Sequence, residues 1–147
     1  MIEEILRSSA FVLLAVILYQ GLGFLWYGPL FGDLWRKEVC MKRISYREEE
    51  KRICASAQSA YIGVAMNSMV MAFVLYNLII ALHFSTFIYA VLLGLGIGAG
   101  FIIPSTLTTF LFEGRGIEKK SFALYIIDNA YPLLGLMLMG AVFSFAV

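Results

Sequence analysis

Residues 53–112 read ICASAQSAYIGVAMNSMVMAFVLYNLIIALHFSTFIYAVLLGLGIGAGFIIPSTLTTFLF, a stretch without a single Asp, Glu, Lys or Arg. A water-soluble domain needs surface charge to stay dissolved, so an uncharged stretch of this length indicates a lipid environment. As one helix it would be about 90 Å long, roughly three times the hydrocarbon thickness of a bilayer. We therefore expect two membrane-spanning helices here, joined by a turn at residues 83–86.

The uncharged stretches on either side, residues 8–32 and 121–147 with Asp128 as an exception, each hold one further span of about 20 residues. The sequence predicts an all-α membrane protein with four transmembrane helices in a compact bundle, as a single domain over residues 1–147. The expected spans are residues 5–27, 59–82, 87–112 and 122–145. A charged loop is expected at 33–57, either as a solvated connector or with a short amphipathic helix at 46–57.

The basic residues predict the orientation of these spans. Of the 11 Lys and Arg, seven lie in the first loop, three lie in the third, and only Arg7 falls on the opposite side. By the positive-inside rule both charged loops face the cytoplasm, and the N- and C-termini lie outside. We expect a multi-pass protein of the plasma membrane with the lipid bilayer as its first partner. A cleaved signal peptide is disfavoured, because the chain begins with Glu3 and Glu4 rather than with basic residues.

An aromatic turn, residues 26–35 (WYGPLFGDLW), closes the first span. Trp and Tyr favour the headgroup level of a membrane, and proline disfavours a helical residue before it, so the helix is expected to end at Gly28. One interpretation is an interfacial anchor and turn. The other is that the turn folds back against the cytoplasmic mouth of the bundle and lines a site there. The residues that carry either interpretation are Trp26, Tyr27, Pro29 and Trp35.

Small and polar residues mark the helix contacts. Glycines at alternate positions give the third span two interleaved ridges that let helix backbones approach closely, in this chain or between copies: Gly94, Gly96, Gly98 and Gly100. Pro104 is expected to free a backbone carbonyl, and the hydroxyls that follow it could bond to the backbone again. Gln20, Asn67 and Asn77 should face protein, because a polar amide in lipid is costly unless it is bonded.

Asp128 is the one acid within a predicted span, about 9 Å from its start. An acid at this depth requires a partner, a proton or water. The nearest cation by topology is Arg115, so a helix-locking network with Glu113 and Tyr131 is one interpretation. The other is a cation or proton site, because Pro132 frees the carbonyl of Asp128 and places it beside the carboxylate.

The chain also resembles a known family at four places: the aromatic turn, residues 100–104 (GFIIP), residues 111–115 (LFEGR) and residues 128–131 (DNAY). The resemblance is to the bacterial and archaeal membrane proteins grouped as domain-of-unknown-function family 1761, and it covers nearly the whole chain. The first loop is longer than in that family. The resemblance implies a four-helix integral membrane protein, and no activity comes with it.

The sequence shows no clear motif for metal binding, cofactor binding or catalysis. Cys40 and Cys54 lie in or beside the first loop without a CxxC pattern, and His83 is the single histidine, so we expect no metal site and no cofactor. A net charge of +1 gives no reason to expect nucleic acid binding. An enzyme is not expected, since one membrane acid has no second acid to share the chemistry. The expected function is a structural or accessory membrane protein, in a homo-oligomer or with another membrane protein. The alternative is a small homo-oligomeric transporter or channel that uses Asp128 and the proline-broken third and fourth helices.

Overall fold

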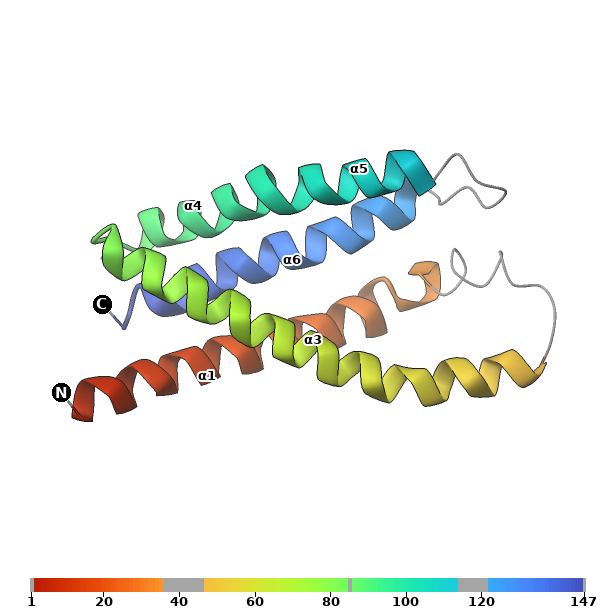
Figure 1. The fold of residues 1–147 in the computed structure, drawn as a ribbon, viewed down its shortest axis with the longest axis horizontal. Coiled ribbons are helices and arrows are strands. Elements are labelled where there is room, and N and C mark those ends of the chain that lie inside the picture. Colours follow the sequence, from red (N-terminus) through yellow and green to blue (C-terminus); the bar gives the residue numbers. More distant parts are fainter. Residues whose placement is uncertain (1, 36–46, 85, 114–121, 147) are drawn as a thin grey trace.

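The computed structural model describes residues 2–35, 47–84, 86–113 and 122–146, and every element in these ranges is helical (Figure 1). Two of the elements, labelled η, are single turns of π-helix. In chain order the elements are α1 (Ile2–Leu25), η1 (Trp26–Leu30), α3 (Arg47–Ala81), α4 (Phe87–Ile97), η2 (Gly98–Ile102), α5 (Ile103–Glu113) and α6 (Phe122–Phe143).

Four stretches of the described chain are long and apolar enough to cross a membrane: Arg7–Leu30, Ile62–Ala81, Phe87–Phe112 and Phe122–Phe143. The prediction of an all-α chain with four such helices is confirmed. These stretches agree with the expected spans to within a few residues, because the charged segments bound them on one side and the turn at His83 separates the middle two.

The second long helix is longer than its apolar stretch. α3 begins at Arg47, so residues 47–57, which the sequence analysis placed in the first loop, continue the second span as one helix of 35 residues. Glu, Lys, Arg and Ala favour helix, and Glu48 and Arg52 have the i, i+4 spacing of a helical ion pair. The charged end of α3 therefore extends beyond the apolar part.

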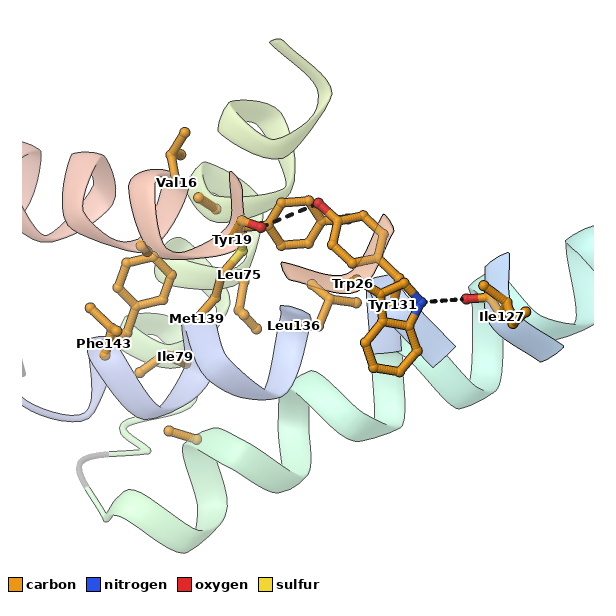
Figure 2. Close-up of a cluster of buried hydrophobic side chains, with 14 residues drawn as sticks. Val16, Tyr19, Trp26, Leu75, Ile79, Ile127, Tyr131, Leu136, Met139 and Phe143 are labelled. Atoms are coloured by element: carbon orange, nitrogen blue, oxygen red, sulfur yellow. Dashed lines mark hydrogen bonds between the residues drawn. The ribbon is translucent and has the colours of Figure 1, made fainter. Parts of the chain in front are cut away.

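The last helix lies at the centre of the structure. Within the most apolar part of each span, 44% of the residues of α6 are buried, against 22% or less in the other three. α6 runs between α1 and the α4–α5 helix, and the N and C ends of the chain lie at the same end of the molecule (Figure 1). Its side chains form the core with α1 and α3, as seen for Leu136, Met139 and Phe143 beside Val16 and Leu75 (Figure 2).

One of the two glycine ridges packs against α6. A methyl group added at Gly94 would overlap the backbone carbonyl of Leu136, and one at Gly98 would come within 2.6 Å of the Leu133 side chain. Gly96 and Gly100 have nothing within 4 Å of such a methyl group. One ridge thus serves contact within the chain, and the other faces outward.

Polar side chains within the spans bond in two ways. Gln20 on α1 donates a hydrogen bond to Ser68 on α3 at 3.0 Å, which joins two helices. Asn77 is exposed and donates to the Phe73 carbonyl of its own helix at 2.7 Å, so the structure places it on the outer surface of the chain. An amide that bonds back to its own helix satisfies one donor without a neighbour.

Candidate functional site

The aromatic turn begins as a π-helix. η1 follows α1 directly, and the N–H of Phe31 bonds to the carbonyl of Trp26, five residues earlier, at 2.9 Å. Pro29 lies inside this turn. Its ring would clash with the carbonyl four residues earlier in an α-helix, and the wider π-helical turn relieves that clash. The helix therefore continues past Gly28, and the prediction that it ends there is wrong.

Side chains of the turn reach across to α6. Tyr27 donates a hydrogen bond from its phenol to Oδ1 of Asp128 at 3.2 Å, and Trp35 donates from Nε1 to the same oxygen at 3.2 Å. The indole of Trp26 is buried and donates to the backbone carbonyl of Ile127 at 3.0 Å (Figure 2). The aromatic turn thus folds back onto the bundle, and two adjacent residues of α6 accept its three donors.

Asp128 lies six residues after the start of α6, one turn before Pro132. Pro132 has no N–H to offer the carbonyl of Asp128, so carboxylate and carbonyl lie together at a break in the helical hydrogen-bond ladder. Both aromatic donors are neutral. They orient the carboxylate.

A reciprocal pair of contacts fixes α1 beside Asp128. The ring of Tyr19 on α1 occupies the space where Gly135 on α6 lacks a side chain, and the Tyr131 phenol on α6 lies against Gly23 on α1. The two rings lie 4.8 Å apart between centroids, and the Tyr131 hydroxyl donates to the Tyr19 carbonyl at 3.3 Å (Figure 2). We call these four residues the tyrosine–glycine clasp. Because each glycine follows its tyrosine by four residues, the two antiparallel helices present matching surfaces.

A cavity of about 430 Å³ opens beside the carboxylate. It is lined by residues from α1, α3, η2 and α6: Tyr19, Val64, Asn67, Met71, Ile102, Asp128, Tyr131 and Pro132. Its lining is mostly apolar with a few polar groups, and it is open on one side, where Val64, Asn67 and Asp128 are exposed. The arrangement can hold a small molecule with its polar end at Asp128.

Three of the polar residues that the sequence singled out line this cavity: Asp128, Tyr131 and Asn67. Asn67 is exposed and donates to the sulfur of Met71 at 3.5 Å. Arg115 and the side chain of Glu113 lie outside the described part of the chain, so their pairing with Asp128 stays a prediction. Within the described residues, no group of three or more His, Cys, Asp or Glu is arranged to hold a metal ion.

Asn129 joins the helices beside the site and was missed in the sequence. It is buried, accepts a hydrogen bond from Thr106 on α5, and donates to the Tyr125 carbonyl at 2.8 Å. Tyr125 in turn donates to the Ile103 carbonyl at 3.2 Å. An amide in an apolar span is itself a signal of a helix contact.

The hydroxyls that follow Pro104 bond to the backbone. Thr108 and Thr109 donate to carbonyls four residues earlier, and Ser105 donates to Ile102 at 2.8 Å. The π-helical turn η2 ends two residues before the proline. The third span thus accommodates Pro104 by a wider helical turn before it. Hydroxyl groups after the proline donate hydrogen bonds to backbone carbonyls around it.

The comparisons with known proteins decide the family. A family model described as "Protein of unknown function (DUF1761)" matches residues 10–144, which include the aromatic turn, both π-helical turns and Asp128. The chain belongs to the DUF1761 family. The resemblance stated from the sequence is thereby confirmed. No curated protein and no solved structure matches this DUF1761 chain, so its function has to be argued from the site itself.

Proposed function

We propose that this DUF1761 protein binds a small solute inside the cytoplasmic membrane, at the cavity beside Asp128, and that it is a small transporter or carrier. One observation carries the proposal: a carboxylate within a membrane-spanning helix lines a cavity that four elements build together. Ionisable residues at such positions are costly in lipid and mark substrate or ion paths. The π-helical turns η1 and η2 near the acid support it further, because such turns frequently occur at functional sites.

The orientation follows from the charges. With 10 of the 11 basic residues in the two loops and the charged start of α3, both loops face the cytoplasm and both termini face out. The cavity then lies in the cytoplasmic half of the membrane. The outward ridge of Gly96 and Gly100 supports a homo-oligomer, because close backbone approach favours association of helices in lipid.

A structural or accessory role is the second candidate, and a separate observation favours it. Trp26, Tyr27 and Trp35 hold the aromatic turn on α6, as a helix lock would. In this case Asp128 stabilises the folded chain, which then assembles with further copies or with another membrane protein.

Substitution of Asp128 by Asn separates the two candidates. The protein and the variant are reconstituted in vesicles for pH-dependent ion flux, and their oligomers are compared for stability in detergent. The transport proposal predicts flux in the wild type that the variant loses. Lower stability of the variant with no flux in either protein contradicts transport and supports the structural role.

A further inference from the structure

We infer that the outer face of α3 binds the same face of a second copy of this chain, with the two α3 helices parallel. We call this face the α3 seam. It consists of six residues within the apolar span Ile62–Ala81: Gly63, Asn67, Val70, Val74, Asn77 and Ala81. Such a pair of copies would form whether or not the cavity beside Asp128 binds a solute.

The α3 seam has the spacing of a parallel coiled coil. Its residues follow one another at intervals of four, three, four, three and four, so they lie along one stripe of the helix. All six are exposed. At 3.6 residues per turn, the stripe lies about 150° from the residues that α3 buries against the rest of the chain: Ser68, Ala72, Leu75 and Ile79. The α3 seam therefore points away from the bundle.

Polar groups of α3 that face the bundle bond to α1. Ser68 accepts a hydrogen bond from Gln20 at 3.0 Å, and Tyr76 donates one to Ser8 at 2.8 Å. The bundle thus satisfies these side chains by contacts between helices. The amides on the α3 seam make no such contact in the described part of the chain.

Asn67 and Asn77 bond within their own helix. Asn67 donates to the Met71 sulfur at 3.5 Å, and Asn77 donates to the Phe73 carbonyl at 2.7 Å. An asparagine side chain has two N–H hydrogens and a carbonyl oxygen, so in the described part of the chain each amide keeps a donor and an acceptor without a partner. Lipid tails offer neither, and an unsatisfied polar group in hydrocarbon is costly.

A second copy satisfies both amides at once. Copies of one membrane protein insert in the same orientation, so a twofold axis along the membrane normal places two α3 helices in parallel and each residue beside its own counterpart. Each amide then meets an identical amide, and the donor of one faces the acceptor of the other. Asn77 lies about 15 Å from Asn67 along the helix, so the two amide pairs also fix the register of the helices.

Small and β-branched residues let the two helices come close. Gly63 has nothing within 4 Å of an added methyl group, and Ala81 lies at the other end of the α3 seam. Val70 and Val74 lie between the amides, and their stiff side chains lose little freedom on packing. Close packing of this kind favours helix association in lipid, where burial of apolar surface gives little net gain.

The α3 seam runs along the open side of the cavity. Asn67 belongs to both, and the exposed Val64 lies three residues before it. The α3 helix of a second copy would therefore border the mouth of the cavity. The ridge of Gly96 and Gly100 lies on α4 and η2, so contact through that ridge would leave α3 facing lipid.

Disulfide cross-linking in the membrane locates the contact. Single cysteines are introduced into the full chain in a Cys40→Ser, Cys54→Ser background, with copper phenanthroline as the oxidant. Val74→Cys should form covalent dimers, because a disulfide requires two Cα atoms within about 7 Å of each other. Phe73→Cys is the matched control, since Phe73 is exposed but lies about 100° around the helix from Val74, and its yield should be several-fold lower. A high yield from Gly96→Cys with none from Val74→Cys would place the contact on the glycine ridge and overturn the inference.

A second variant measures the contribution of an amide without touching the cavity. Asn77 is not among the residues that line the cavity, and Asn77→Leu removes no bond between helices of the described chain. The dissociation constant of the dimer in liposomes, measured by energy transfer between labelled copies, should rise about threefold to tenfold in Asn77→Leu. Ile80→Leu, at an exposed residue off the α3 seam, should leave it unchanged. An unchanged constant in Asn77→Leu, or a Val74→Cys yield no higher than that of Phe73→Cys, would overturn the inference and leave the proposed function standing.

Discussion

Tyr27 and Asp128 lie 101 residues apart in the chain, and the phenol of one donates a hydrogen bond to the carboxylate of the other at 3.2 Å. This contact and its neighbour from Trp35 place the end of the first span against the start of the last. The same carboxylate lines the cavity, so one residue connects the fold of the aromatic turn to the candidate site.

Loss of the Tyr27 hydroxyl should weaken the fold. Tyr27→Phe keeps the ring contacts with Trp35 and Tyr131 and removes one hydrogen bond to a carboxylate. We expect the free energy of unfolding to fall by about 1 kcal/mol, measured by titration with SDS in mixed micelles. Tyr89→Phe, at an exposed tyrosine, is the control and should change little. Equal stability of the two variants would show that the bond to Asp128 does not hold the turn.

The two glycine ridges should respond in opposite ways to an added methyl group. Gly94→Ala forces a methyl group against the Leu136 carbonyl, where backbone has to move, and should lower the free energy of unfolding by about 1–3 kcal/mol. Gly96→Ala, two residues away with open space around it, should be neutral or slightly stabilising. The same SDS titration compares them. If Gly96→Ala lowered the free energy of unfolding more than Gly94→Ala, the packing of α4 on α6 described above would be wrong.

The contact between α5 and α6 should depend on one threonine. Thr106→Val removes the donor to Asn129 at nearly constant volume, and should lower the free energy of unfolding by about 0.5–1.5 kcal/mol. Thr108→Val removes a hydroxyl that is exposed and bonds only within its own helix as far as the described bonds go. Its effect should be smaller. An equal fall in the free energy of unfolding for the two variants would argue against a specific bond to Asn129.

The orientation can be checked with thiol labelling. Cys40 and Cys54 are the two cysteines of the chain, and both are expected on the cytoplasmic side. A membrane-impermeant maleimide added to intact cells should leave the wild type unlabelled and should label it after the membrane is opened. His83→Cys in a Cys40→Ser, Cys54→Ser background should be labelled in intact cells. The reverse pattern would invert the proposed topology.

The sequence predicted the spans well because charge is excluded from the bilayer over a defined length. It singled out Asp128 for the same reason. The hydrogen-bond donors to Asp128 could not be predicted from charge exclusion. Tyr27 and Trp35 come from a turn that folds back only through tertiary packing. Pairing by closeness along the chain pointed instead to Arg115, which lies outside the described residues.

The glycines show a second limit of sequence reasoning. Spacing revealed two ridges on the third span, but Gly94 and Gly96 look alike until the neighbouring helix is in place. The tyrosine–glycine clasp did leave a signal. A tyrosine followed four residues later by a glycine occurs in the first span and again in the fourth, at Tyr19 and Tyr131. Such a repeat on two apolar helices predicts that they pack together.

The central claim is that the cavity beside Asp128 is open to polar solutes within the membrane, and thiol modification tests it most directly. Asn67→Cys, in the background without Cys40 and Cys54, places a thiol in the cavity lining, and Val70→Cys places one on an exposed face of α3 outside it. Two methanethiosulfonate reagents are compared in proteoliposomes, one with a trimethylammonium group and one with a sulfonate. We predict that the Asn67→Cys thiol reacts and that the Val70→Cys thiol stays unreactive in lipid. An Asn67→Cys thiol as unreactive as that of Val70→Cys would contradict the account.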